Sequence, residues 1–218
     1  VAKSGEKKHQ IELALLERIH DNLEKNITVR NMEFNEEEQI IVKHLFLLTS
    51  KPVIYAANIS EDDVGKDPND LPLVKKLMDY AASENAEVLV ICARLEEEIA
   101  QLAPEERETF MQELGISESG LDRLVKACYR LLGLISFITV GPKEVRTWTV
   151  LKGTKAPQAA GKIHSDFERG FIRAEVIPYD TLIEVGSYIA AKEKGLVRSE
   201  GKEYVVNDGD VILFRFNV

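Results

Sequence analysis

Two short apolar runs, Lys51–Asn58 and Glu87–Ala93, constrain the fold of this chain more than any other feature. Each is a continuous apolar segment bounded by loop residues, which is typical of a strand buried on both faces of a parallel sheet. Between them, the apolar spacing over Leu73–Ser83 predicts a helix. Strand, helix and strand in this order form a βαβ unit, so we expect two parallel strands. Two strands alone are too few for a stable doubly wound sheet, so we expect flanking strands outside these 218 residues.

The residues ahead of the first run predict two helices joined by a short link. Over Lys7–Lys25, most apolar side chains recur every three or four residues, as on one face of a helix. Asn35 precedes three glutamates and is typical of an N-cap, because acidic residues in the first turn complement the helix dipole. We expect the second helix to run through Leu48 and Asn26–Phe34 to form a polar turn, which gives an αα-hairpin.

The rest of the chain changes from helical to β-rich at Leu134. Helices are predicted at Leu95–Leu102, Pro104–Leu114 and Leu121–Leu132, and a helix broken at Gly186 is predicted over Tyr179–Lys194. Strands are expected at Ile135–Val140, Val145–Leu151, Phe171–Ile177, Glu203–Val206 and Val211–Phe216, with turns at Gly141-Pro142 and Asn207–Asp210. The predicted fold class is α/β plus α+β: an incomplete parallel sheet with a helical hairpin, followed by a compact ubiquitin-like module.

Charge is distributed unevenly along the chain, whose formal net charge is −9. Val1–Val140 holds 16 Lys and Arg against 26 Asp and Glu, whereas Gly141–Val218 holds 12 against 11. This contrast indicates a domain boundary near Val140. The balance argues against a protein covered all over with nucleic-acid contacts, although a local excess of positive charge can still bind one.

The sequence also limits the cellular setting. The apolar runs are too short to cross a bilayer, and the polar start is not followed by the apolar segment of a signal peptide. Cys92 and Cys128 have no metal-ligand spacing, so neither a disulfide framework nor a zinc site is expected. We expect a cytoplasmic protein without membrane contacts.

Asn58-Ile59-Ser60-Glu61 follows the first predicted strand, and ligands of open α/β sheets bind at the carboxyl ends of strands. P-loop proteins commonly read guanine at this place with Asn-Lys-x-Asp, whose carboxylate accepts the two N–H donors of that base. Here the lysine is replaced by Ile59 and the aspartate by Glu61, so we expect weaker selection of guanine. An asparagine at a strand end also caps turns, which is the alternative interpretation.

The second strand is followed by Cys92-Ala93-Arg94-Leu95, a loop of small residues that leads into a helix. Backbone amides of such a loop often flank a nucleotide base. An ordinary connection between a strand and a helix can have this kind of sequence too. The segment is therefore consistent with a base-binding site after the first strand but does not distinguish it from a plain connection.

Seven segments carry a family resemblance: Asn58–Glu61, Phe110–Gly115, Lys143–Trp148, Ala156–His164, Asp166-Phe167, Gly170–Ala174 and Asp208–Val211. Together they resemble the Obg-like ATPases, the YchF family, and the resemblance covers essentially the whole chain. The Ala156–Ala174 block is its longest and most specific part.

The resemblance implies a protein of three parts. Residues 1–34 would belong to an inserted helical (coiled-coil) domain, 35–134 to the C-terminal part of a P-loop nucleotide-binding domain, and 135–218 to a TGS domain. Family members prefer ATP to GTP, which implies ATP as ligand, with Mg²⁺ in the full-length parent. The implied base-binding residues are Asn58, Ile59, Glu61, Cys92 and Ala93, with Ile59 meeting the adenine partly through its backbone.

The chain departs from the family pattern in one large respect. No Gly-x-x-x-x-Gly-Lys-Ser/Thr segment occurs in the 218 residues, and no Asp-x-x-Gly follows a strand ahead of Asn58. Those segments supply the phosphate cradle and the magnesium contacts of P-loop hydrolysis. We therefore expect a C-terminal portion that neither hydrolyses ATP nor binds it tightly by itself, and we assign it no catalytic and no metal-binding residue.

The segment from Lys143 to Arg173 is rich in basic residues, with Trp148, Phe167 and Phe171 interleaved. Such a patch can hold RNA phosphates while an aromatic ring stacks on a base. The alternative is a solvated edge whose aromatics lie in the core. His164 precedes Ser165 and Asp166, but neighbouring side chains rarely form a triad, so a structural role beside a nucleic-acid surface is favoured. The candidate RNA or ribosome contacts are Lys152, Lys155, Lys162, His164, Arg169 and Arg173.

Two functions follow from these features. The leading hypothesis is a slow Obg-like ATPase that acts as a regulatory switch on ribosomes, with ATP, ribosomes or RNA, and other regulatory proteins as partners. The rival is a non-enzymatic RNA- or ribosome-binding adaptor that acts through the TGS domain. A metal-dependent hydrolase built on the acidic loop Asp62–Asp70 is a poor third reading, because the loop lacks EF-hand spacing and a partner histidine.

Overall fold

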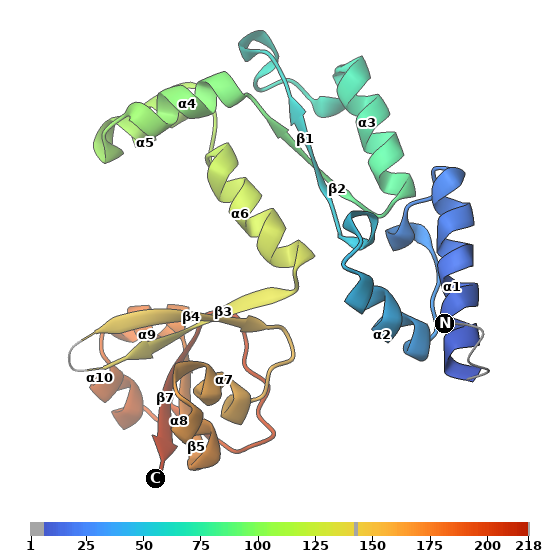
Figure 1. Ribbon diagram of the computed structural model, residues 1–218. Coiled ribbons are helices and arrows are strands. Elements are labelled where there is room, and N and C mark those ends of the chain that lie inside the picture. Colours follow the sequence, from blue (N-terminus) through green and yellow to red (C-terminus); the bar gives the residue numbers. More distant parts are fainter. Residues whose placement is uncertain (1–6, 142–143, 218) are drawn as a thin grey trace. The chain divides into compact units, whose positions relative to one another are not determined.

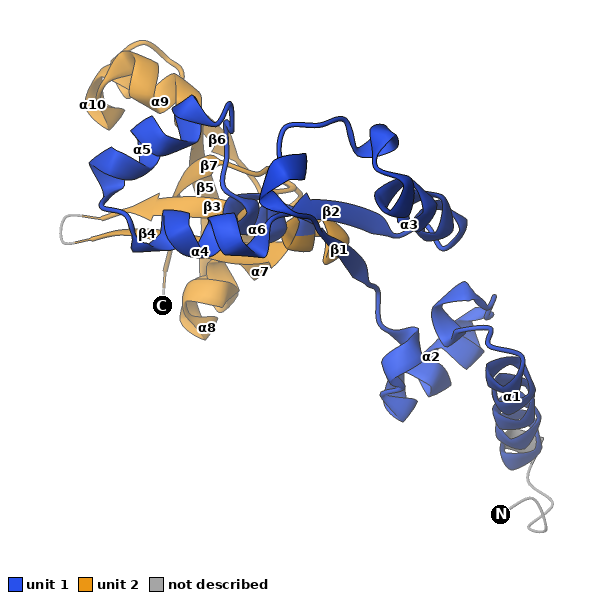
Figure 2. Cartoon of the chain, turned by 90° about the horizontal axis from the view of Figure 1, so that it is seen from above, with its two compact units in different colours: residues 1–127 blue, residues 128–218 orange. Residues whose placement is uncertain are grey.

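The computed structural model describes residues 7–141 and 144–217 and divides the chain into two compact units (Figure 2). The N-terminal unit is Val1–Ala127 and the C-terminal unit is Cys128–Val218. No helix among the described residues is both long enough and apolar enough to span a membrane.

The N-terminal unit begins with the expected pair of helices, α1 (Lys7–Glu24) and α2 (Glu36–Leu45). Their apolar faces share a core built around Leu15, Ile19, Val29 and Val42. The link is more than the predicted polar turn, because it contains the 3-10 helix η2 (Val29–Asn31), and Val29 is only 1% exposed. Helix α2 ends before Leu48, where Phe46 adopts a left-handed conformation with φ of 51° that cannot continue an α-helix.

Asn35 is the N-cap of α2, as the sequence predicts, and it also forms a capping box with Glu38. The Asn35 side chain accepts the Glu38 N–H at 2.9 Å, and the Glu38 carboxylate accepts the Asn35 N–H at 3.0 Å. Replacing Asn35 by alanine removes one of these partners, and we expect it to lower the free energy of unfolding by about 1 kcal/mol. Urea unfolding followed by circular dichroism would measure the loss. Asn35→Ser keeps the acceptor and should stay close to wild type; equal losses in both variants would contradict a capping role.

The predicted βαβ unit is confirmed. Strand β1 (Ile54–Asn58) pairs in parallel with β2 (Glu87–Ile91), and α3 (Pro72–Ser83) packs against both strands (Figure 1). The short 3-10 helices η3 (Leu48–Ser50), η4 (Glu61–Asp63) and η5 (Pro68–Asp70) lie in the connections. The expectation that β1 is buried on both faces is wrong, since Ala56 and Asn58 are exposed. Side chains alternate between the two faces of a strand, and Ala56 and Asn58 lie on a face that stays open to solvent, whereas Ala57 on the other face is buried.

Glu84, just after α3, joins the helical pair to the βαβ unit. Its carboxylate accepts hydrogen bonds from the Tyr55 hydroxyl at 2.6 Å, from Arg30 at 3.1 Å, and from Asn31 and Tyr80 at 3.2 Å each. These bonds, that of Tyr55 first, lower the pKa of Glu84. Three segments far apart in sequence therefore meet at one ionised side chain.

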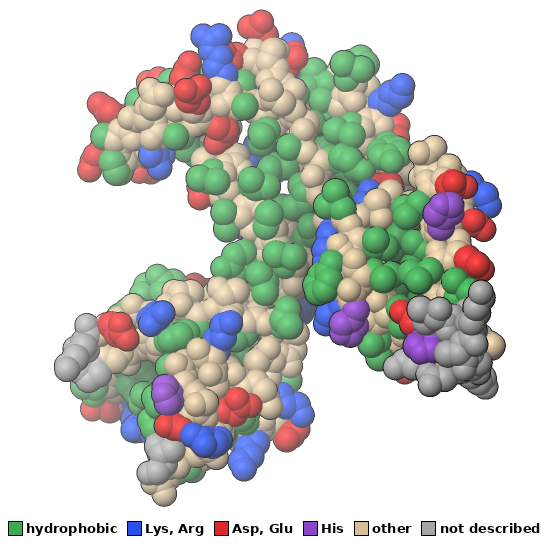
Figure 3. All heavy atoms as spheres, viewed as in Figure 1, with side chains coloured by type: hydrophobic (Ala, Val, Ile, Leu, Met, Phe, Trp, Pro, Cys, Tyr) green, Lys and Arg blue, Asp and Glu red, His purple; other side chains and the backbone are tan. Residues whose placement is uncertain are grey.

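The three helices predicted after β2 are present as α4 (Ala93–Gln101), α5 (Pro104–Glu113) and α6 (Gly120–Leu131). Cys92, Leu95 and Ile99 form a small core with the apolar side chains of α5 and of the loop after β1. Exposed leucine and valine side chains remain on α6, where hydrophobic spheres gather in Figure 3.

The C-terminal unit is a five-stranded mixed sheet with helices on both faces (Figure 1). The strands are β3 (Leu134–Val140), β4 (Val145–Leu151), β5 (Phe171–Pro178), β6 (Arg198–Glu200) and β7 (Asp210–Phe216), in the order β4-β3-β7-β5-β6. Only β3 and β7 pair in parallel among the described strands of this sheet. The helices are α7 (Ala156–Ile163), α8 (Ser165–Arg169), α9 (Tyr179–Val185) and α10 (Tyr188–Glu193).

Each face of this sheet has its own core. One face packs Phe137, Val176 and Ile212 against the alanines of α7 and against Phe167 of α8. The opposite face packs Ile177 and Val211 against α9 and α10. Alternate residues of β5 and β7 therefore belong to opposite faces, as the two-residue period of a strand requires.

Three details of this unit bear on the sequence predictions. The strand expected at Glu203–Val206 is wrong: only Val205 forms an isolated bridge, with Lys155, and β6 lies earlier in the chain. Both edges of β7 are already occupied, by β3 and β5, so no hairpin partner fits beside it. The break at Gly186 is confirmed, with φ of 86°. Of the predicted Gly141-Pro142 turn, Pro142 lies outside the described residues, as does Lys143.

Candidate functional site

The carboxyl ends of β1 and β2 are held together by Asn58. Its side-chain oxygen accepts the Ala93 N–H, at the start of α4, at 2.9 Å. The next residue, Ile59, donates its N–H to the Ile91 carbonyl at 2.8 Å. The structure thus brings three of the predicted base-binding residues, Asn58, Ile59 and Ala93, to one edge of the parallel sheet.

Glu61 is held at the same edge by an ion pair with Arg94, which was not among the predicted site residues. Arg94 follows Ala93, and its Nε lies 2.7 Å from Glu61 Oε1, with Glu98 Oε1 at 3.8 Å. Both partners of the short ion pair are exposed. Arg94 takes up part of the acceptor capacity of the carboxylate that the predicted base contact also needs. Its position next to the predicted base-binding loop was the signal available in the sequence.

Cys92 is placed differently from the rest of the predicted set. Its side chain is 6% exposed and packs in a small core that includes Ile59. A pocket of about 270 Å³ lies beside this core, lined by residues that include Ile59, Cys92, Lys66 and Arg123. Asn58, Glu61 and Ala93 do not line this pocket. A base in contact with Asn58, Glu61 and Ala93 would therefore lie at the exposed edge of the sheet and not in this pocket. Cys92 would then support the loop through its buried side chain.

The acidic loop after β1 uses its carboxylates locally. Asp63 accepts hydrogen bonds from Ser60 at 2.9 Å and from Lys66 at 2.7 Å, and Asp67 caps η5 through the Asn69 N–H at 2.8 Å. The Lys66 bond, first among the causes, lowers the pKa of Asp63. These bonds account for Asp63 and Asp67 as parts of the loop structure.

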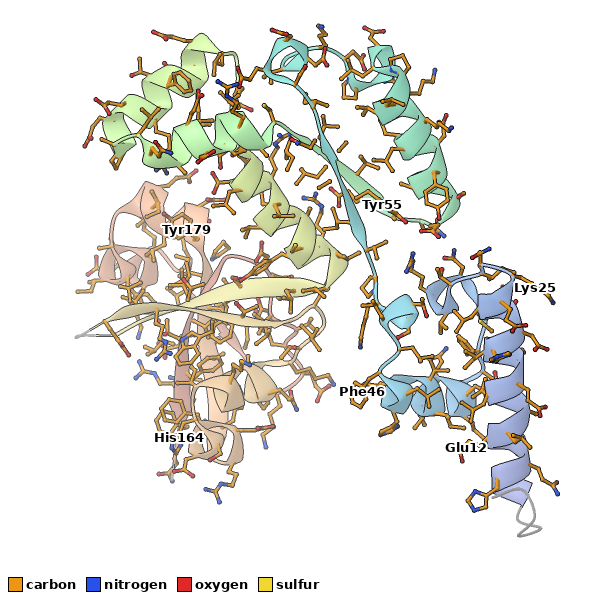
Figure 4. All side chains as sticks on the ribbon, turned by 45° about the horizontal axis from the view of Figure 1, so that its top comes forward. Glu12, Lys25, Phe46, Tyr55, His164 and Tyr179 are labelled. Atoms are coloured by element: carbon orange, nitrogen blue, oxygen red, sulfur yellow. The ribbon has the colours of Figure 1, made fainter. Side chains whose placement is uncertain are left out.

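Most of the predicted RNA contacts lie around α7 and α8, where Figure 3 shows basic and acidic side chains close together. Lys155 pairs with Glu203 at 2.5 Å, and Arg169 pairs with Asp166. His164 is exposed, and its Nδ1 accepts the Asp166 N–H at 3.1 Å, which caps α8 (Figure 4). This cap gives His164 a structural role at the start of α8, and its place beside a nucleic-acid surface stays a prediction. Lys152 and Lys162 lie on the turn after β4 and in α7.

Arg173 does not lie with the other five residues. It precedes Ala174, which is buried in the core under α7, so its own side chain lies on the opposite face of the sheet. There its Nη2 donates to Glu175 Oε1 at 3.1 Å. The six predicted residues therefore do not form one surface.

The three aromatic residues of the segment pack into the unit. Phe171 is 5% exposed, and Phe167 stacks on Phe216 with ring centroids 3.8 Å apart. The Trp148 indole N–H donates to Thr139 at 2.8 Å, and Arg146 lies over its ring. The alternative of core aromatics applies to Phe171, which has no free face for stacking on a base.

These elements define a mixed α/β protein with a parallel βαβ unit and a separate mixed sheet. Residues 134–217 match the family model YchF-GTPase_C, described as a protein of unknown function (DUF933). The "Ribosome-binding ATPase YchF" of Bacillus subtilis is 56% identical over 218 residues, which are all of this chain and 59% of that protein. "Obg-like ATPase 1" of Rattus norvegicus is 45% identical over 187 residues, 85% of this chain and 46% of that protein.

A solved structure agrees with these sequences. The Schizosaccharomyces pombe YchF GTPase superposes with a TM-score of 0.80 at 34% identity, over 96% of this chain and 55% of that one. The chain belongs to the YchF family of Obg-like ATPases, which confirms the resemblance stated from its sequence. It spans 59% of the length of the Bacillus subtilis relative.

Proposed function

We propose that this chain supplies the base-reading edge and the C-terminal module of a ribosome-associated ATPase that prefers ATP to GTP and hydrolyses it slowly. The single observation that carries the proposal is the joined edge of β1 and β2, where Asn58 bonds to Ala93 and Glu61 pairs with Arg94. The names of the relatives, ribosome-binding ATPase and Obg-like ATPase, support the same function. ATP with Mg²⁺ is the proposed cofactor of the full-length protein, in the cytoplasm, and the chain alone is proposed not to hydrolyse it.

The domain boundaries given above, residues 1–34, 35–134 and 135–218, are part of this proposal. A ubiquitin-like TGS assignment for the last segment is supported by its strand order. Numbered within the unit, the order β4-β3-β7-β5-β6 is 2-1-5-3-4, with the first and last strands parallel in the middle. The family-model match over residues 134–217 covers nearly the same range.

Glu61 is the residue whose exchange tests the proposed base reading. An aspartate in its place resembles the guanine-reading motif more closely, so Glu61→Asp in the full-length protein should raise GTP affinity relative to ATP by about tenfold. Competition between labelled ATP and GTP analogues would measure the ratio. Glu97→Asp, on the exposed side of α4, is the matched control and should leave the ratio unchanged. An unaltered ratio in Glu61→Asp would sink the role given to this carboxylate.

The second candidate function is a ribosome- or RNA-binding adaptor that works through the C-terminal unit without nucleotide. It is favoured by the positive balance of residues 141–218 against the acidic remainder of the chain. The isolated chain would then bind ribosomes in a manner that weakens as salt rises.

A further inference from the structure

A nearly buried glutamate lies at the centre of the sheet face that carries α10. The side chain of Glu175 is 6% exposed. Its Oε1 accepts hydrogen bonds from Arg173 Nη2 at 3.1 Å and Arg215 Nε at 3.2 Å, and its Oε2 accepts them from Arg215 Nη2 at 3.1 Å and the Tyr188 hydroxyl at 2.9 Å. Lys192 Nζ lies 4.0 Å from the same oxygen. Three cations surround one carboxylate and leave an excess of positive charge.

The two arginines occupy directly opposite positions on β5 and β7. Like charges opposite each other destabilise a sheet. Glu175 lies two residues from Arg173 on the same face, so its carboxylate offsets this repulsion and fixes both guanidinium groups. Apolar side chains would stabilise such a face at least as well as a buried ion pair does. The arrangement is therefore better explained by a need for fixed positive charge at the surface than by stability.

The outer atoms of these cations remain open to solvent. The side chains of Arg173, Arg215 and Lys192 are 53%, 46% and 61% exposed. Each guanidinium has five N–H donors, and the Nη1 groups take no part in the bonds to Glu175. A planar fork of donors held in one orientation matches the oxygens of a phosphate group. On the α7 side, by contrast, Lys155 and Arg169 are paired with carboxylates at the surface.

We propose that Arg173, Arg215 and Lys192 form an RNA-binding surface that contacts backbone phosphates of the ribosome. The inference rests on the proposed ribosome association and names both the face of the sheet and the chemistry of the partner. Glu175 is a positioning residue, since its carboxylate holds the two guanidinium groups, and Tyr188 acts on them only through its hydrogen bond to Glu175. Phosphate contacts of this kind are independent of base sequence.

The test uses the 218-residue chain, purified Bacillus subtilis ribosomes and the RNA extracted from them. The double variant Arg173→Gln/Lys192→Gln removes two charges and leaves the two bonds between Arg215 and Glu175 in place. Binding to naked RNA should weaken by about tenfold or more, and the slope of log affinity against log salt should fall by about 1.5. The comparison variant, Lys155→Gln/Arg169→Gln, removes the same charge from the α7 side, the rival face favoured by the sequence. Because these two cations are already paired with carboxylates, the variant should leave the slope unchanged. The unfolding midpoints of both variants show whether the unit remains folded.

Each other outcome overturns the proposal in a recognisable way. If the wild-type chain binds ribosomes but the comparison variant loses as much affinity as the Arg173/Lys192 variant, the assigned face is wrong and the ribosome association stands. If polyglutamate competes as well as RNA does, the surface recognises acidic protein instead. If the wild-type chain binds neither ribosomes nor RNA, the proposed association itself fails.

Discussion

Replacement of Phe137 by alanine is expected to lower the free energy of unfolding of the C-terminal unit by about 4 kcal/mol. Phe137 lies in the central part of β3, is 0% exposed, and meets Phe214 of β7 edge to face with ring centroids 5.9 Å apart. The substitution removes apolar contact area, leaves a cavity between the sheet and α7, and breaks an aromatic pair.

Denaturant unfolding of the chain, followed by the fluorescence of Trp148 in the same sheet, would measure this loss. Val140→Ala is the control, because Val140 belongs to the same strand and is exposed. It should change stability by no more than about 0.5 kcal/mol. A Phe137→Ala variant as stable as the control would mean that this core is not the one that holds the unit together.

The sequence predicts those parts of the fold that depend on local pattern. The two parallel strands follow from apolar runs on either side of one helix, and the start of α2 follows from Asn35 and the acidic residues after it. The kink at Gly186 follows from the conformational freedom of glycine, which adopts φ of 86° there. Each of these features is fixed by residues close together in the chain.

Features that depend on pairing between distant segments were missed. The short run at Glu203–Val206 has the composition of a strand, but β7 already lies between β3 and β5. This strand order cannot be predicted from the local sequence. The exposure of Ala56 and Asn58 on β1 depends on which distant elements cover each face of the strand, not on the residues of the strand itself. The ion pair between Arg94 and Glu61 forms only because the fold brings the loops after β1 and β2 together.

The candidate sites show the same division. The edge formed by Asn58, Ile59 and Ala93 was predicted because ligands bind at strand ends, a rule that needs only the order of the elements. The basic segment of the sequence predicts one patch, but the alternation of a strand places Arg173 and the residues of α7 on opposite faces. The cluster around Glu175 joins β5, β7 and α10, so no single segment could reveal it.

Exchange of Glu175 for glutamine is expected to destabilise the C-terminal unit by about 3 kcal/mol at neutral pH and by much less in acid. The hydrogen bonds from Arg215, the largest cause, together with those of Tyr188 and Arg173, lower the pKa of Glu175 from 4.5 to about 2. A carboxyl whose pKa is lower in the folded than in the unfolded chain contributes stability above its unfolded value. That contribution is lost as the pH falls from about 4.5 through about 2, where the folded form also takes up a proton.

The difference in unfolding free energy between wild type and Glu175→Gln should therefore be constant from pH 7 down to about 5 and shrink steeply below that. Urea unfolding at several pH values would trace it, with Glu193→Gln on the exposed side of α10 as the control that shows no such trend. A difference as large at pH 3 as at pH 7 would show that Glu175 is not held ionised by its arginines. The two guanidinium groups would then lack the fixed orientation on which the phosphate-binding surface depends.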